Sequence, residues 1–305
     1  MTLCPTTAFS PNVLSDLQNI SCYEFMRTAY EAGTMIAIIA GITGYFVVLR
    51  RSAFVAHAFS EIGFAGASGA ILLDSAYFPP IAGLLLGSIL GGLAIAVLGR
   101  RAANRDTQIG IILAFALGLG LLFISLYKAF ATAAISILFG EIVGISPGEV
   151  TLTFEASALI IVVMAFLYRP LLFASLDEDV AEAKGMPMVF LGTAFMLVVA
   201  VAVSFAVQVT GVLLIFSLMV TPAAAAQYVS RRPSRSIAFS VAVAVVATWV
   251  GLFVAFYTPY PVSFFITAIN FSLYIAVRLV RRGLKAKPID RASVKQVPRA
   301  PTVPT

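Results

Sequence analysis

Long uncharged apolar stretches restrict the fold of this chain more than any other feature of its sequence. Residues 185–230 and residues 236–277 contain no Asp, Glu, Lys or Arg. A bilayer crossing takes about 20 apolar residues, so each stretch is long enough for two crossings. Within a bilayer the backbone must satisfy its own hydrogen bonds, which a helix does inside one segment. The sequence therefore predicts an all-α, polytopic membrane helix bundle.

Composition places the chain in the same class. Of its 305 residues, 60% are hydrophobic and 11% are charged, whereas soluble domains carry about 25% charged residues. The net charge of +6 does not indicate a nucleic-acid partner, because Lys and Arg stand in short runs between apolar segments. Such runs are typical of the cytoplasmic loops of membrane proteins.

Segment lengths predict nine crossings. They are residues 29–49, 52–73, 80–98, 108–127 and 150–168, two within 185–230 that divide near 208–211, and two within 236–277 that divide at 257–261. Residues 129–144 are apolar but short, which favours a re-entrant or interfacial piece. Pro222 should kink or interrupt the seventh crossing. Eight crossings are the alternative if that segment does not cross fully.

Basic residues follow every odd-numbered crossing, and the exits of the even-numbered crossings carry almost none apart from Lys128. The odd exits carry Arg50, Arg51, Arg100, Arg101, Arg105, Arg169, Lys184, Arg231, Arg232, Arg235, Arg281, Arg282, Lys285 and Lys287. The positive-inside rule then predicts an N-terminus outside and a C-terminus in the cytoplasm. The chain divides into an extracytoplasmic leader or interfacial segment (1–28), a transmembrane domain (29–280) and a basic tail (281–305) that we expect to be disordered.

The leader lacks a basic region followed by an apolar core, so it is not a cleavable signal peptide. It contains both cysteines, Cys4 and Cys22. An extracytoplasmic leader would allow the two to form a disulfide, and two free thiols are the alternative.

An ionisable pair lies inside the second crossing. His57, the single histidine, and Glu61 are four residues apart, so a helix presents both on one face. Ionisable groups at this depth usually mark an ion pathway, a proton relay or a partner. Imidazole and carboxylate suit Zn(II), Mn(II) or Fe(II), and a two-fold homodimer would supply four ligands. The alternative is a His–Glu pair that only satisfies itself between helices.

Two further stretches are candidates for function. Pro222, followed by four alanines, suits either a gate or close helix packing. The acidic run after the fifth crossing suits a short amphipathic helix that docks a cytoplasmic partner, with a solvated loop as the alternative. Its centre comprises Ser175, Leu176, Asp177, Glu178, Asp179, Val180, Ala181, Glu182, Ala183 and Lys184. Glu141 and Glu155 are weaker candidates near an interface.

Motifs of ATP hydrolysis and of protease chemistry are absent. The sequence has no GxxxxGK[ST], CxxC, HExxH or GxSxG pattern. The chain is therefore not expected to be an enzyme or to hydrolyse ATP itself.

Several motifs, in order and spacing, resemble the permease subunit of ATP-binding-cassette (ABC) importers for transition metals, the ABC-3 type. They are RRSAFVAHAFSEIGFAG, RDTQIGIILAFALGLGLLFISL, LFGEIVGISPGEV, RPLLFASLDEDVAEAKGMP and VTGVLLIFSLMVTPAAAAQYVSRRP, and the resemblance covers about residues 29–280. It implies a type II importer-like fold, a homodimer or paralogous pair in the bacterial cytoplasmic membrane, a cytoplasmic ATPase and an extracytoplasmic solute-binding protein. It also implies that residues 175–184 are the coupling helix, and that the cargo is zinc, manganese or iron with no permanently bound cofactor.

The sequence departs from this family at the ion site. The family usually has Asp, three residues and then His on the second crossing, whereas here His57 stands in the first position and Glu61 in the second. We interpret this as a retained site with exchanged ligands; a changed substrate, or a site not used for high-affinity capture, is the alternative. A secondary transporter or channel that uses Glu61 and His57 as an ion or proton relay is the competing function. Such proteins often contain internal repeats, and none is clear here.

Overall fold

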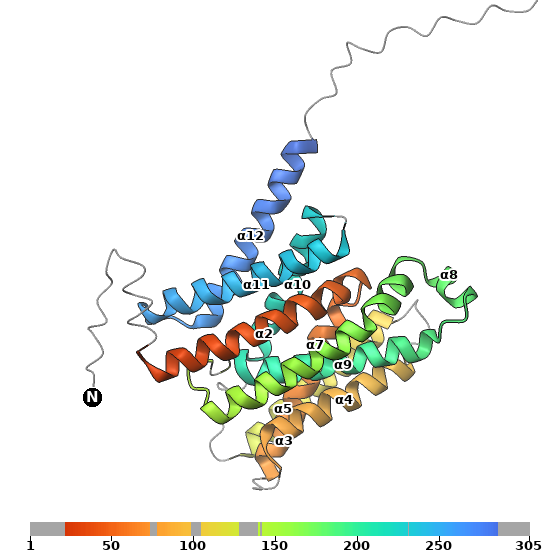
Figure 1. Ribbon diagram of the computed structural model, residues 1–305. Coiled ribbons are helices and arrows are strands. Elements are labelled where there is room, and N and C mark those ends of the chain that lie inside the picture. The colour runs from red at the N-terminus through yellow and green to blue at the C-terminus, as the bar shows by residue number, and fades with distance from the viewer. Residues whose placement is uncertain are drawn as a thin grey trace, which may run out of the picture.

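Helices account for all regular structure in the part of the chain that the computed structural model describes, which is residues 22–73, 78–98, 105–127, 140, 142–230 and 232–285. The predicted all-α class is confirmed (Figure 1). The helices are α2 (Glu24–Leu49), α3 (Ala53–Leu73), α4 (Pro80–Leu98), α5 (Arg105–Leu126), α7 (Pro147–Leu176), α8 (Glu178–Ala183), α9 (Met188–Thr210), α10 (Val212–Val229), α11 (Pro233–Phe256) and α12 (Val262–Lys285).

Eight of the described helices are long and apolar enough to cross a membrane, and α4 contributes a shorter apolar helix over Pro80–Ile95. Helix α10, which contains Pro222, is one of these eight, and α4 itself continues to Leu98. An interruption at Pro222 is not found, because α10 is continuous from Val212 to Val229 with Pro222 inside it. A proline removes one backbone donor, and helices packed around it in a membrane can satisfy the freed carbonyl group.

The two long uncharged stretches divide where the sequence predicts. Between α9 and α10 the chain turns at Gly211, whose φ of 81° and ψ of 163° favour glycine. Between α11 and α12 it turns after Phe256 and resumes helix at Val262. Each stretch therefore forms two helices.

The helix α7 is longer than predicted at both ends. It begins at Pro147 under a capping box, in which the Ser146 hydroxyl accepts from the Glu149 N–H and the Glu149 carboxylate accepts from the Ser146 N–H. It continues through Pro170 to Leu176, whereas the sequence predicts an end at residue 168. Pro170 lies inside the helix and does not end it.

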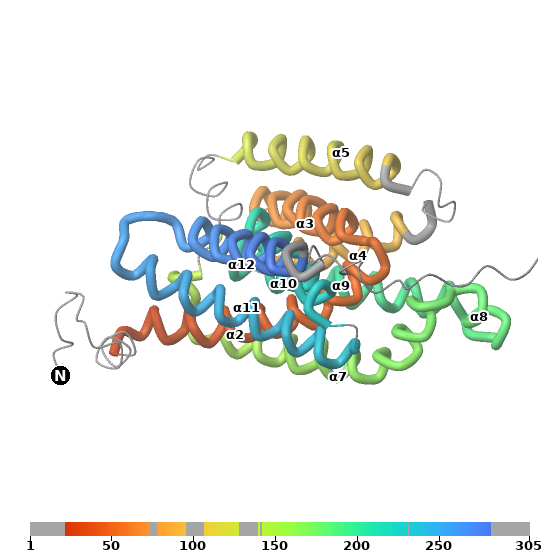
Figure 2. The backbone as a smooth tube through the Cα atoms, turned by 90° about the horizontal axis from the view of Figure 1, so that it is seen from above, coloured from red at the N-terminus to blue at the C-terminus, as the bar shows by residue number. Residues whose placement is uncertain are grey.

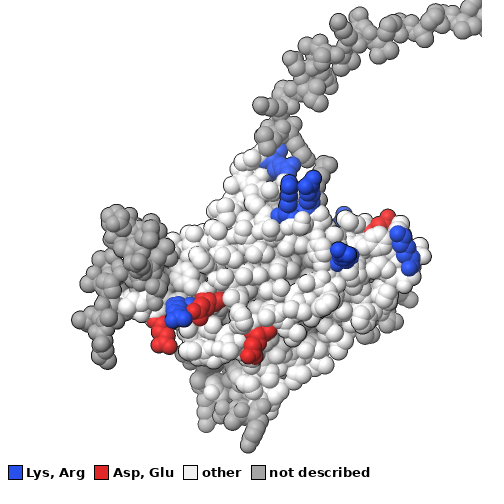
Figure 3. Space-filling view, in the orientation of Figure 1, with Lys and Arg blue, Asp and Glu red and all other residues white. Residues whose placement is uncertain are grey.

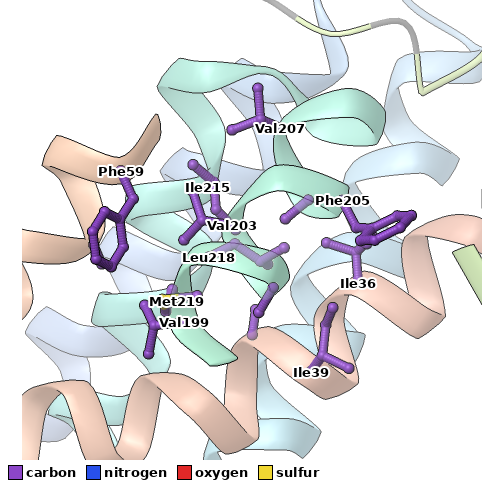
Figure 4. Close-up of a cluster of buried hydrophobic side chains, with 14 of the residues drawn as sticks. Ile36, Ile39, Phe59, Val199, Val203, Phe205, Val207, Ile215, Leu218 and Met219 are labelled. Carbon is purple, nitrogen blue, oxygen red and sulfur yellow. The ribbon is translucent and has the colours of Figure 1, made fainter. Parts of the chain in front are cut away.

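Helices α2, α9 and α10 form the centre of the bundle, and α5 lies at its edge (Figures 1 and 2). Figure 4 shows buried side chains that join these central helices and α3, among them Ile36, Phe59, Val203 and Leu218. Helices α3 and α4 lie closest where glycine faces glycine. A Cβ at Gly66 would collide with the Gly83 carbonyl oxygen, so small residues permit this contact.

Charge is distributed unevenly along the bundle. On the face in Figure 3, basic side chains gather toward the end that carries α8 and toward the projecting end of α12, with a broad uncharged surface between them and the acidic residues of the opposite end. We call the end of the bundle that carries α8 the α8 end, and the other end of the bundle the opposite end. The Arg27–Glu31 ion pair (2.9 Å) lies near the start of α2.

Some predictions fall on residues outside the described chain. These are most of the leader with Cys4, most of the proposed re-entrant piece with Glu141, and the tail from residue 286. At the edges of these gaps, Cys22 is not a free thiol, and Gly140 lies against the Thr210–Gly211 turn at the opposite end.

Candidate functional site

Helix α3 places His57 and Glu61 one turn apart on a single face. Helix α3 packs extensively against both α4 and α5. Glu61 is 6% exposed, and His57 is half-buried. The structure therefore puts a carboxyl group and an imidazole ring together inside a membrane-spanning helix, as the spacing predicts.

Aromatic side chains surround the imidazole of His57. Its ring centroid lies 5.5 Å from that of Phe216 on α10 and 6.4 Å from that of Phe54 on α3. The Ser60 hydroxyl donates to the His57 carbonyl oxygen at 2.7 Å. The contact between His57 and Phe216 could not be predicted from the sequence, because it joins residues far apart in the chain.

Buried polar atoms of this pair have no hydrogen-bond partner within the described chain. They are Nδ1 of His57 and Oε2 of Glu61. A buried polar group without a partner costs about 1–3 kcal/mol. The interpretation of a pair that only satisfies itself is therefore not supported, and these lone pairs are suited to a cation.

The described residues of one copy do not bring together enough His, Cys, Asp or Glu ligands for a closed metal site. No group of three or more His, Cys, Asp or Glu side chains comes together in the described residues. Glu155, a weaker candidate, is exposed on α7. A four-ligand site around His57 and Glu61 would require a second copy.

The acidic stretch forms a defined projection at one end of the bundle (Figure 1). Ser175 and Leu176 end α7, and Asp177 joins it to the six-residue α8 by accepting from the Val180 N–H at 3.1 Å. Ala181 is buried, and the chain leaves α8 through Gly185, whose φ is +77°. Nζ of Lys184 lies 5.2 Å from the centre of the Phe173 ring.

The exposed surface of this projection mixes acidic and apolar groups. Glu178, Asp179 and Glu182 are all exposed, and Leu176 is 68% exposed. Its backbone is held at both ends, so it is not simply a solvated loop. Such a surface is suited to contact with a partner.

Pro222 is buried in α10. One turn earlier, the Met219 carbonyl group lies so close to Gly44 of α2 that a Cβ there would collide with it. This contact accords with the close-packing interpretation. The gate at Pro222 stays a prediction.

A largely apolar cavity at the opposite end contains two polar residues that were not predicted as functional. It has a volume of about 450 Å³ and is lined in part by Glu149 and Gln208. Nε2 of Gln208 donates to Oε1 of Glu149 at 3.3 Å. The Ser-x-x-Glu capping pattern before a long apolar run is the sequence signal that would have located Glu149.

Comparisons with known proteins agree with this architecture. The model of the ABC 3 transport family matches residues 22–281. The manganese transport system membrane protein MntC of Listeria monocytogenes is 26% identical over 241 residues, which are 79% of this chain and 85% of that protein. The high-affinity zinc uptake system membrane protein ZnuB of Buchnera aphidicola is 25% identical over 256 residues, 83% of this chain and 97% of that protein. Among solved structures, PsaBC from Streptococcus pneumoniae in complex with Fab is similar with a TM-score of 0.81 and 25% identity, covering 91% of this chain and 100% of that chain.

Proposed function

The chain belongs to the ABC 3 transport family, and from this we propose that it is the membrane-spanning permease subunit of an ATP-driven importer for a divalent transition metal ion. The observation that carries the proposal is the family match over residues 22–281, which includes every described helix except the last turn of α12. Relatives named for manganese and for zinc support these two ions as cargo.

Two copies of the chain form the ion path in this proposal. Facing α3 helices bring two His57 and two Glu61 side chains together, and the four ligands hold the ion as cargo. Nitrogen and oxygen donors of this kind bind Zn(II), Mn(II) and Fe(II). The unpartnered Nδ1 and Oε2 atoms support this assignment.

The exchanged order of the two ligands is compatible with such a site. Both residues lie on one face of α3, and a two-fold axis would place each residue of one chain near its counterpart. Exchanging His and acid moves each ligand type by one helical turn, about 6 Å. The set of ligands is kept, while the geometry that selects the ion can change.

ATP hydrolysis is assigned to a separate cytoplasmic ATPase, because the chain has no P-loop. We assign the α8 projection as the site at which that ATPase docks. The basic α8 end is then cytoplasmic, the opposite end receives the ion from an extracytoplasmic solute-binding protein, and the membrane is the bacterial cytoplasmic membrane.

Helix α7 links the two ends mechanically. It runs for 30 residues from the Ser146 cap to Asp177, where α8 begins. It also packs against α2 and α9, two of the central helices. Movement of α8 by the ATPase would therefore act on α7 and through it on the core, and the interface between the two copies would alternate between outward and inward access.

Metal content of cells tests this function. A strain that lacks the chain should accumulate less manganese or zinc than its parent, measured by mass spectrometry of whole cells, and the wild-type gene should restore it. Restoration should fail when the ATPase encoded with it carries an inactive P-loop. Full restoration without a working ATPase would contradict the proposal and favour a secondary transporter or channel that relays ions through Glu61 and His57.

A further inference from the structure

A shallow apolar groove lies between α2, α7 and α11. Its volume is about 370 Å³, and its lining includes Phe46, Ala165, Tyr168 and Ser234. The lining is almost entirely apolar, with the Tyr168 and Ser234 hydroxyl groups as exceptions. In chemistry such a groove is suited to a hydrocarbon chain.

The groove reaches the edge of the bundle at the α8 end. Phe46 lies three residues before the end of α2 at Leu49, which is roughly 5 Å along the helix axis. Ser234 is the second residue of α11. The groove therefore opens where the apolar surface meets the basic end, at the depth of the first carbons of an acyl chain.

Two arginines stand at this edge. Arg169 and Arg235 directly follow the lining residues Tyr168 and Ser234, and both are exposed. The single ion pair within the described chain is Arg27–Glu31, so neither guanidinium is neutralised by a described carboxylate. An Arg fork binds phosphate well, and basic groups at a membrane surface attract anionic lipids.

The groove lies on the side of the bundle away from the candidate ion site. In Figure 2, α7 and α11 occupy one side and α5 with α3 the other. A dimer that joins α3 to its counterpart, as in the proposed function, would leave this groove facing the bilayer. A single copy of the chain contains the whole groove and both arginines, and neither depends on which ion is carried.

From these observations we propose that the groove is a binding site for one anionic phospholipid, with an acyl chain along Ala165 and Phe46 and the phosphate between Arg169 and Arg235. The lipid would connect α7, which leads to α8, with α2 and α11. Neither the family match nor the relatives' names assign a lipid to this surface.

Lipid retention by the purified full-length chain tests the proposal. The chain is incubated in detergent micelles that contain equimolar phosphatidylglycerol and phosphatidylcholine, separated from free micelles, and its bound lipids are quantified by mass spectrometry. Wild type should retain phosphatidylglycerol in several-fold excess. The double variant Arg169→Gln/Arg235→Gln should lose that excess, because each arginine near a membrane surface is worth about five-fold in anionic-lipid binding.

Three matched variants complete the test. Arg278→Gln removes an exposed arginine of α12, far from the groove in sequence, and should retain the wild-type lipid ratio. Arg169→Lys/Arg235→Lys should keep most of the excess, and Ala165→Phe, which fills the groove, should lower the amount of both lipids. An unchanged ratio in the double Gln variant, or an equal loss in Arg278→Gln, would overturn the proposal. Unchanged helical content by circular dichroism confirms that each variant is folded.

Discussion

Glu61 and Gly66 both lie on α3, and they affect the stability of the chain in opposite ways. Glu61 carries a buried oxygen without a hydrogen-bond partner in the described chain, which is unfavourable for stability and useful for binding a cation. Gly66 does the reverse, because its lack of a side chain stabilises the contact with α4. The residue proposed to bind the ion and the residue that stabilises the contact with α4 are therefore five positions apart.

Gly66→Ala should destabilise the chain, because the new Cβ would collide with the Gly83 carbonyl oxygen. Overpacking of this kind costs about 1–3 kcal/mol, and backbone atoms cannot move aside as a side chain does. The measurement is thermal unfolding in detergent, where we expect a lower midpoint. Gly118→Ala makes the same change on α5, where nothing lies within 4 Å, and should not lower it. Equal midpoints for both variants would contradict the packing argument.

Among the elements, α8 is a short helix that is held by the residues on either side of it. Asp177 caps it, and Gly185 ends the turn that follows. Its acidic side chains Glu178 and Glu182 take part in neither contact, so they can be changed without loss of the cap. This distinction follows from the structure, since the sequence shows only a run of acidic residues.

Reversing charge with Glu178→Lys/Glu182→Lys should weaken association with the ATPase, because both side chains are exposed on the projection assigned to docking. The measurement is the amount of ATPase that copurifies with the tagged permease. Glu155→Lys is the control, since Glu155 is exposed on α7 far from α8, and it should leave copurification unchanged. Wild-type recovery of ATPase with the double variant would remove α8 from the interface.

Most elements could be predicted from local sequence signals. Uncharged length predicted the helices, Gly211 predicted the α9–α10 turn, and the Tyr-Thr-Pro cluster after Phe256 predicted the α11–α12 turn. The end of α7 could not be predicted, because a proline stops helices in water but is tolerated among packed helices in a membrane. The Phe216 contact with His57 and the Glu149–Gln208 pair depend on which helices pack together, and that is not a local property of the sequence.

At the scale of the whole molecule, helix ends alternate between the α8 end and the opposite end. From the basic residues at the α8 end, the positive-inside rule predicts that this end is cytoplasmic. Single cysteines introduced into a chain without Cys4 and Cys22 test this orientation with a membrane-impermeant maleimide on intact cells. Tyr260→Cys, in the exposed α11–α12 turn, should react, and Ala183→Cys at the end of α8 should react only after the membrane is opened. The reverse pattern would invert the topology.

One copy of the chain supplies part of the proposed ion site, and a second copy would have to supply the rest. A single chain holds a His and a carboxylate in a buried helix, with no third candidate ligand nearby in the described residues. We therefore predict that ion transport by a dimer depends on both residues, and that the packing of the helices depends on neither.

The initial rate of manganese or zinc uptake by cells carrying Glu61→Gln or His57→Ala tests whether these two residues form the ion site. At equal membrane abundance and equal ATPase copurification, each variant should lower the rate at least about ten-fold, since even groups that only orient metal ligands are worth 10–100-fold in metal affinity. Ser60→Ala removes a hydroxyl that bonds to the His57 carbonyl oxygen and should retain most of the rate. Wild-type uptake by both the Glu61 and the His57 variant would contradict the assignment of the ion site.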